Sequence, residues 1–174
     1  MSASTTNSSG PGPLTIHTIG HSDHTVKAFV GLLRQYGITL VVDVRSQPYS
    51  RWVPRFNRES LDRDLEEAGI VYRFMGDSLG GRPADPSLYE PGRERPDYER
   101  LERADVYQAG VDRLLKLARE ERVAVMCSEG DHRHCHRHLL IAQTLLCRGV
   151  RVLHVQPEGG VVEGEQVGRQ LSLF

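Results

Sequence analysis

Short runs of apolar residues recur along the chain, separated by longer stretches whose apolar positions follow a helical period. The runs are rich in β-branched residues, which is typical of strands. The run ITLVVDV at residues 38–44 is almost continuously apolar, as expected for a strand covered on both faces. The sequence predicts five strands, at residues 14–20, 38–44, 70–75, 122–127 and 150–155.

The intervening stretches predict amphipathic helices. Residues 25–37 place Phe29, Val30 and Leu33 on one face and end at Gly37, a residue type that often terminates helices. Similar patterns predict three further helices, at residues 59–69, 106–120 and 136–149. Because strands and helices alternate, we expect a three-layer α/β/α fold with a mostly parallel sheet of about five strands.

Three segments differ from this alternation. Residues 1–13 are rich in Ser, Thr, Gly and Pro and are predicted to be a disordered tail. Residues 14–157 form a single predicted α/β domain, and residues 158–174, with several Gly and Glu, are expected to be a flexible tail. The charged connection at residues 76–103 is long and rich in Gly and Pro, which indicates a functional or a disordered segment.

The composition is that of an ordinary globular protein, with 39% hydrophobic and 26% charged residues. No apolar run approaches the length of a membrane span, and the first residues lack the features of a secretion signal. We therefore expect a cytoplasmic protein without a membrane partner, in which Cys127, Cys135 and Cys147 are reduced. The net charge of −1 provides no overall basic field, so nucleic acid would need local groups of arginines.

Polar and reactive residues follow the predicted strands at their carboxyl ends, where open parallel sheets bind ligands. His21 follows the first strand, Asp43 lies at the end of the second, and Cys127 and Glu129 lie at the end of the fourth. These four residues are the predicted catalytic group. His21 and Asp43 fit a general base and its orienting carboxylate, although Asp43 equally fits a structural role in which it holds Arg45 or a loop amide.

Cys127 lies where a strand passes into a loop and then a helix, a position at which amides and the helix dipole stabilise a thiolate. It is a candidate nucleophile or pocket residue, and the alternative is a small apolar residue that ends a core strand. Cys127 and Arg133 also match the C-x5-R spacing of cysteine phosphatases and sulfurtransferases, although the loop contains one glycine, Gly130.

The stretch CSEGDHRHCHRH at residues 127–138 is dense in residue types that bind metals. Cys127 and Cys135 do not have the short C-x2-C spacing of many zinc sites. Two histidine pairs at i, i+4 spacing would bind a metal ion if the stretch were helical, His134 with His138 and His132 with His136. A metal ion is therefore an open alternative to a solvated helix start, and no other cofactor is indicated.

Arginines and aromatic residues are interleaved in the predicted loops after the second and third strands. Arg45, Arg51 and Arg82 fit phosphate binding, with neighbouring rings such as Trp52 for stacking on a base. The alternative is an exposed face on which arginine stems pack on rings. The predicted substrate- or phosphate-binding residues are Arg45, Ser46, Arg51, Asn57, Gly80, Gly81, Arg82, Cys135, His136 and Arg137.

Six motifs occur in order between residues 18 and 137: TIGHS, VVDVRSQPYSR, FN, GIVY, LGG and MCSE…CHR. Together they resemble the bacterial family catalogued as domain of unknown function 488, over about residues 16–155. The resemblance implies a small cytoplasmic α/β protein with a cysteine-bearing active site and no established reaction. The family pattern includes both cysteines and the His-Arg pair but no fixed arginine at position 133, which disfavours the phosphatase interpretation.

The last five residues, QLSLF, resemble the Q-L-x-L-F peptide by which bacterial replication and repair proteins bind the DNA polymerase sliding clamp. In that motif the leucine and the aromatic residue enter an apolar pocket while the glutamine forms hydrogen bonds beside it. The alternative is a tail that packs against its own domain. The predicted partner-binding residues are Gln170, Leu171, Leu173 and Phe174.

These observations predict an enzyme of DNA metabolism that repairs or processes a base or nucleotide and is recruited by the sliding clamp. DNA or a nucleotide is the expected ligand. One alternative is a cysteine phosphatase or sulfurtransferase that uses Cys127 and Arg133. Another is a non-catalytic adaptor that binds a nucleotide or nucleic acid.

Overall fold

The computed structural model describes residues 11–168 of the 174-residue chain. Its six-stranded sheet has the order β3-β2-β4-β1-β5-β6, in which β1 to β5 are parallel and β6 is antiparallel to β5. The five predicted strands are confirmed with slightly shorter bounds. The strands are β1 (Thr15–Gly20), β2 (Leu40–Asp43), β3 (Val71–Phe74), β4 (Val123–Cys127), β5 (Arg151–Val155) and β6 (Val161–Glu163).

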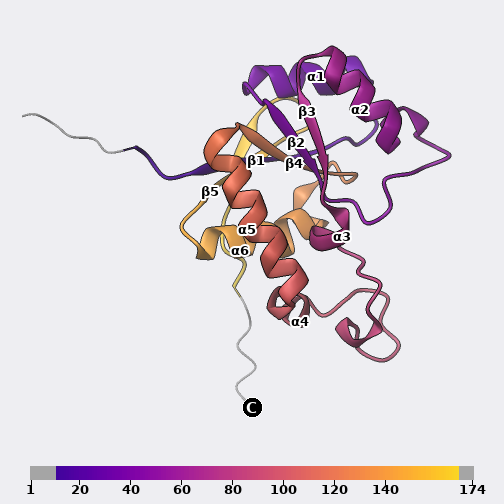
Figure 1. Ribbon diagram of the computed structural model, residues 1–174, viewed down its shortest axis with the longest axis vertical. Helices are drawn as coiled ribbons and strands as arrows, with labels where there is room; N and C mark the ends of the chain where they lie inside the picture. The colour runs from indigo at the N-terminus through magenta and orange to yellow at the C-terminus, as the bar shows by residue number, and fades with distance from the viewer. Residues whose placement is uncertain (1–10, 169–174) are drawn as a thin grey trace, which may run out of the picture.

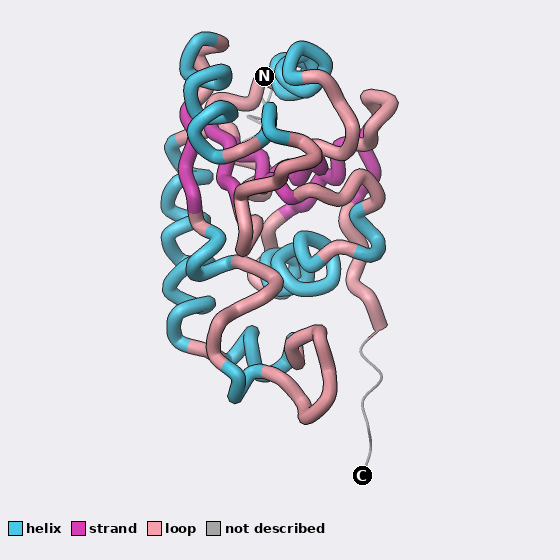
Figure 2. The backbone as a smooth tube through the Cα atoms, turned by 90° about the vertical axis from the view of Figure 1, so that its right-hand side faces the viewer, coloured by secondary structure: helices cyan, strands magenta, loops and turns pink. Residues whose placement is uncertain are grey.

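Helices cover both faces of the sheet, as Figures 1 and 2 show. On one face lie α1 (Val26–Gln35) and α2 (Arg58–Glu67), and on the other lie α5 (Asp105–Glu120) and α6 (Gln143–Cys147). The predicted three-layer α/β/α fold is confirmed.

The bounds of α1 follow from its sequence. The Thr25 side chain accepts a hydrogen bond from the amide of Ala28 and so caps the first turn. Gly37 then ends the helix with a φ of +63°, a conformation that favours glycine. Between these signals, Phe29 and Leu33 are buried against the sheet.

The core is divided into two apolar clusters by the sheet. Val41 packs with the side chains of α1 and α2 on one face, whereas Val42 packs with those of α5 and α6 on the other. Side chains alternate between the two faces of a strand, so a strand covered on both sides must be apolar at successive positions. This requirement accounts for the continuous apolar run at residues 38–44.

The helix predicted at residues 136–149 is not regular. Its first part is a π-helical segment, η4 (Arg137–Ala142), and only the second part is the α-helix α6. A π-helical turn contains more residues than an α-helical turn. At the start of this segment the consecutive residues His136, Arg137 and His138 are all buried.

The long connection between β3 and α5 has a defined path, so the functional alternative for residues 76–103 is favoured over disorder. It contains α3 (Gly76–Leu79), the 3₁₀ turn η2 (Pro86–Leu88) and α4 (Tyr98–Arg103). Figure 1 shows that the chain between α3 and α4 extends away from the sheet. The amide of Asp97 donates to the carbonyl of Leu88 and closes this excursion at its base.

The first part of the tail predicted from residue 158 onward contains β6, which extends the sheet. Beyond β6, the amide of Gly164 donates to the carbonyl of Val152. The Gln143 side chain then bonds to the carbonyl of Glu165 and the amide of Val167. The sequence analysis missed β6 because its Val-Val pair is short and flanked by glycines.

Residues 1–10 and 169–174 lie outside the described part of the chain. The disorder predicted for the first residues and the clamp-binding peptide at Gln170–Phe174 therefore stay predictions. Among the residues that the structure describes, none of the helices has the length and apolar character needed to cross a membrane.

A chain that ends at Pro157 should be less stable than one that ends at Gly168. It loses β6 and exposes the edge of β5, whose unpaired backbone groups favour aggregation. Loss of the ladder hydrogen bonds is expected to lower the free energy of unfolding by about 2 kcal/mol. Urea unfolding of the two chains measures the difference, and equal midpoints would show that residues 158–168 contribute nothing to the fold.

Candidate active site

The carboxyl ends of β1, β2 and β4 lie side by side. The parallel register pairs Gly20 with Cys127 and Asp43 with Met126. Backbone hydrogen bonds continue past the strands. The amide of His21 donates to the carbonyl of Cys127, and the amide of Val44 donates to the carbonyl of Met126. The residues that follow the three strands therefore begin at one edge of the sheet.

A cavity of about 480 Å³ opens at this edge. Eight of the predicted site residues line it: Cys127, Glu129, Arg45, Ser46, Gly81, Arg82, Cys135 and His136. The other lining residues are Gln47, Glu94, Arg95, Pro96, Tyr98, Ser128 and His134. The predicted convergence of distant segments on one pocket is thus observed for most of its members.

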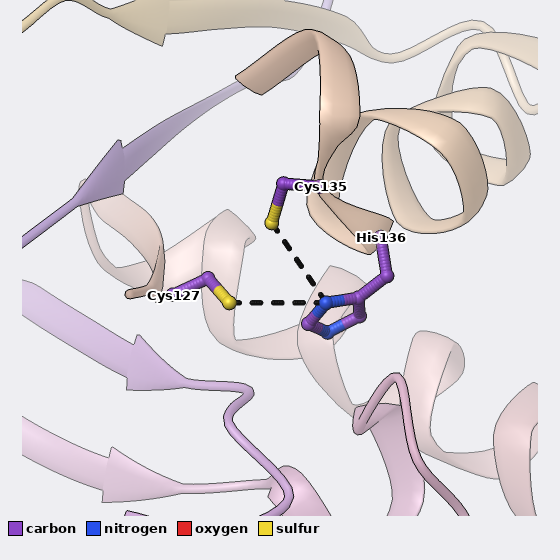
Figure 3. A group of neighbouring side chains, drawn as sticks. All are labelled: Cys127, Cys135 and His136. Carbon is purple, nitrogen blue, oxygen red and sulfur yellow. Dashed lines mark hydrogen bonds between the residues drawn. The ribbon is translucent and has the colours of Figure 1, made fainter. Parts of the chain in front are cut away.

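Two cysteines and one histidine meet in the cavity wall, and we call Cys127, Cys135 and His136 the thiol–imidazole triad. Their relative exposures are 8%, 2% and 9%. The Nδ1 atom of His136 lies 3.8 Å from Cys127 Sγ and 3.8 Å from Cys135 Sγ. In Figure 3 both sulfur atoms point toward the same nitrogen of the ring.

The ring of His136 is held in one orientation. Its Nε2 atom lies 3.2 Å from the carbonyl oxygen of Val44, which can only accept, so Nε2 carries the proton. Gly81 packs directly on the ring, and a Cβ atom at this position would lie 2.7 Å from His136 Cγ. The LGG motif is therefore explained by a close approach that a larger residue would block.

The triad and its surroundings favour a thiolate at Cys127. The hydrogen bond from the Cys135 thiol, more than any other contact, lowers the pKa of Cys127 well below its usual range, and His136 lowers it further while burial opposes both. The same hydrogen bond and burial raise the pKa of Cys135. Cys127 is thus the more acidic thiol of the pair and the one that carries negative charge first.

A buried ion pair lies beside the cavity. Asp43 accepts hydrogen bonds from Arg45 Nε at 2.9 Å and Arg45 Nη2 at 2.7 Å, and the hydroxyl of Tyr72 donates to it at 2.6 Å. Burial, and then the Asp43 charge, raises the pKa of Tyr72, so its hydroxyl stays a donor. The structural alternative for Asp43 is therefore the one observed.

His21 is not oriented by Asp43 and does not line the cavity. Its ring stacks on Phe56 at a centroid distance of 4.5 Å, and its Nδ1 donates to the carbonyl of Ser22 at 2.9 Å. Burial lowers the pKa of His21, which favours the neutral ring. The predicted base and orienter pair is not formed, because the carboxylate is occupied by Arg45 and Tyr72.

Arg137 lies beneath the loop that follows β4. Its side chain is fully buried, and Nη2 donates to the carbonyl of Gly130 at 3.0 Å. Gly20 allows the loop to cross β1, because a Cβ there would lie 1.7 Å from the carbonyl oxygen of Glu129. Arg137 therefore holds the loop after β4 through one hydrogen bond and is not among the residues that line the cavity. Its Nε and Nη1 atoms are buried without a hydrogen-bond partner among the described residues.

Besides Arg137, three predicted binding residues lie outside the cavity lining. Gly80 packs against Ser46, and the Asn57 side chain accepts from the amide of Ser50. Arg51 lies over the exposed ring of Trp52 at 4.7 Å. The first two shape loops, whereas Arg51 belongs to a separate basic and aromatic surface.

The C-x5-R loop of a phosphatase is not formed. Arg133 is 71% exposed, pairs with Asp131 at 2.8 Å and does not line the cavity. An anion at Cys127 would therefore not be held by this arginine, which argues against the phosphatase or sulfurtransferase alternative.

Several residues of the long connection line the cavity but were not predicted from the sequence, chiefly Arg95 and Tyr98. The guanidinium of Arg95 lies over the Tyr98 ring at 4.8 Å. The unusual length and charge of residues 76–103 were the only signal for them. Tyr72 was missed because a buried tyrosine in a strand is ordinarily part of the core.

A second group of imidazoles is buried behind the cavity wall, and it consists of His132, His138 and His154. His138 Nδ1 lies 3.1 Å from His154 Nε2, and Thr18 Oγ1 lies 2.7 Å from His154 Nδ1. Burial lowers the pKa of His154 to about 3. The predicted i, i+4 pairs are not formed, since His136 belongs to the triad and the exposed His134 lies near Asp131.

Both histidine-containing groups have enough ligand atoms for a metal ion, but their geometries differ. In the three-histidine group, the rings of His132 and His154 stack at 13° and 4.1 Å. The in-plane lone pairs of stacked rings lie in two nearly parallel planes, so they do not converge on one ion unless the rings rotate. The lone pairs of the triad do converge.

Fold and site together define a single-sheet, three-layer α/β protein with a cysteine-bearing cavity at the carboxyl edge of its parallel strands. The chain belongs to the family described as Domain of unknown function DUF488, whose sequence pattern matches residues 25–144. No curated protein and no solved structure matches the chain.

Replacing Asp43 with Asn should strongly destabilise the protein. The substitution leaves the buried Arg45 charge uncompensated, which is expected to lower the free energy of unfolding by about 3–5 kcal/mol. Urea unfolding checks this value. Asp131→Asn is the matched control, because it breaks an exposed ion pair and should change the stability little. Similar losses in both variants would contradict the role given to Asp43.

Proposed function

We propose that this protein is an enzyme of DNA metabolism that processes a nucleotide or a base of DNA in the cavity. The observation that carries the proposal is the convergence of the three strand ends on the thiol–imidazole triad. Scattered surface residues have no reason to meet in this way, and buried reactive groups in a cleft are typical of active sites. The reaction takes place at the triad, and the substrate enters past the arginines.

The cavity entrance favours an anionic substrate. Arg82 and Arg95 are exposed lining residues, and the guanidinium group matches phosphate oxygens in geometry and charge. Glu94 and Glu129 also line the cavity, so the positive charge is local. A phosphate between two arginines, with the rest of the substrate reaching the triad, fits this distribution.

An aromatic surface near the same edge supports a nucleotide over a simple phosphate. The loop after β2 carries Trp52, which is 79% exposed, together with exposed Tyr49 and Arg51. Exposed rings beside arginines stack on unpaired bases. An enzyme that acts on a base must reach it in single-stranded or flipped form, so unpaired DNA is the expected ligand.

The proposal includes recruitment by the DNA sliding clamp through the QLSLF peptide, which lies outside the described residues. Its support is the match of all four specified positions to Q-L-x-L-F. The proposal also includes a cytoplasmic location, which agrees with such a partner. The adaptor alternative predicts nucleotide binding without turnover, and the turnover assay below separates it from the enzyme.

Binding of a single-stranded oligonucleotide can be followed directly, because Trp52 is the only tryptophan. Addition of the oligonucleotide should quench its fluorescence. Arg82→Ala with Arg95→Ala should lower the affinity and reduce the slope of log K against log salt by about 0.7 per lost phosphate contact. Arg63→Ala, an exposed arginine of α2, is the control and should leave the slope unchanged.

The same protein is then assayed for turnover on oligonucleotides that carry damaged or modified bases. Cys127→Ser should abolish product formation while binding persists, whereas Cys147→Ser, at an exposed cysteine outside the cavity, should retain it. Binding without turnover on any substrate would support the adaptor. The absence of any binding would refute the DNA-metabolism proposal itself.

Clamp recruitment is tested with three chains measured against a purified bacterial clamp. The full-length chain should bind with micromolar affinity, which corresponds to about 8 kcal/mol. Leu173→Ala with Phe174→Ala should remove binding, because these residues are the apolar anchors of the motif. Ser172→Ala is the matched control at the unspecified position and should bind normally. Equal binding by all three would contradict the assignment.

A further inference from the structure

We infer that the thiol–imidazole triad is a divalent metal site that binds Zn²⁺ through Cys127 Sγ, Cys135 Sγ and His136 Nδ1. The three atoms belong to two elements, since Cys127 ends β4 and the other two residues precede η4. All three are buried, and their ligand atoms lie within 4.8 Å of one another. The cavity lies directly in front of them.

The distances match tetrahedral coordination. With Zn–S bonds of about 2.3 Å and a Zn–N bond of about 2.0 Å, tetrahedral angles place sulfur and nitrogen about 3.5 Å apart. The two observed Sγ···Nδ1 distances are both 3.8 Å. A single ion between the three atoms would therefore require only small shifts of the side chains.

Hydrogen bonding alone explains this arrangement less well. With the proton on Nε2, Nδ1 has one in-plane lone pair, and because the Cys135 thiol donates to Cys127, the Cys127 thiol is the one that can donate to Nδ1. The two sulfur atoms nevertheless lie at the same distance from it. A cation bound by all three atoms accounts for the short distance from Nδ1 to both sulfurs, which a single hydrogen bond does not.

The environment of His136 is that of a metal ligand. Metal-bound histidines ordinarily donate their second ring N–H to a carbonyl or carboxylate, which fixes the ring. Here Nε2 donates to the Val44 carbonyl, and Gly81 packs on the ring beside Nδ1. The Val44 carbonyl and Gly81 thus fix the ring so that the Nδ1 lone pair of His136 faces the two sulfur atoms.

The donor set selects the kind of ion. Thiolate and imidazole ligands favour Zn²⁺ over Mg²⁺ and Ca²⁺, which prefer oxygen. Three protein ligands leave the fourth position for water or a substrate atom, as in catalytic zinc sites. This position faces the cavity, because all three residues line it. In this arrangement Cys127 serves as a ligand, and it is not the nucleophile.

The experiment uses the full-length chain without a substrate, so it stands apart from the proposed DNA-processing function. After incubation with Zn²⁺ and desalting, elemental analysis should find about one equivalent of zinc. The Co²⁺-loaded protein should show thiolate-to-cobalt charge-transfer absorption and the intense visible bands of a tetrahedral centre. No retained zinc, or bound Co²⁺ without thiolate absorption, would overturn the inference.

Variants place the ion on the triad. Cys135→Ser and His136→Gln should lose the cation on desalting, whereas Cys147→Ser and His134→Ala should keep it. Gly81→Ala retains all three ligands but displaces the ring, and should weaken Zn²⁺ binding about 10- to 100-fold, as loss of a supporting contact does. If the ligand variants do not fold, the cobalt spectrum of the wild-type protein decides. Cation loss that follows His154→Gln but not His136→Gln would assign the metal to the three-histidine group and overturn the inference.

Discussion

The parallel alignment of β1, β2 and β4 is the constraint on which the rest of the structure depends. Because the three strands end together, Gly20, Asp43 and Cys127 start three loops at one edge of the sheet. The loops need only cross the ends of neighbouring strands to enclose a cavity. Gly20 makes this crossing possible by leaving room for the carbonyl of Glu129. The order of the strands therefore determines where the reactive residues lie more than the sequence of the loops does.

Buried polar contacts then stiffen this edge. Asp43 holds Arg45 and Tyr72 in one network, and Arg137 supports the loop after β4 from below. Isolated buried charges are costly, and the Asp43 charge is fully partnered, which restricts the surrounding chain to one arrangement. The Val44 carbonyl and Gly81 hold the ring of His136 at the two sulfur atoms.

Much of the fold could be predicted from the sequence, because apolar periodicity reports which faces are buried. The five parallel strands and α1, α2 and α5 were predicted in this way. The short elements and the irregular helix were not. The short strand β6 has too few residues to show a period, and η4 has a period that neither the helical nor the strand pattern matches.

The candidate site was predicted in outline, since residues that follow parallel strands must lie at one edge. The hydrogen bonds within the site were not predictable, because the roles of Asp43 and His21 depend on which side chains contact them in the folded chain. Arg95 and Tyr98 come from a connection without periodicity, so only the folded chain places them. The i, i+4 histidine pairs failed as predictions because the segment from His132 to His138 is not an α-helix.

The wide turn of η4 has a consequence for how this region can vary between related chains. It distributes three neighbouring side chains among three surroundings: His136 to the cavity wall, Arg137 to the underside of a loop, and His138 to the imidazole group. A standard helical turn would hold one residue fewer. Deleting one residue of η4 would rotate the residues that precede it relative to α6. Insertions and deletions in this segment should therefore be tolerated less often than substitutions.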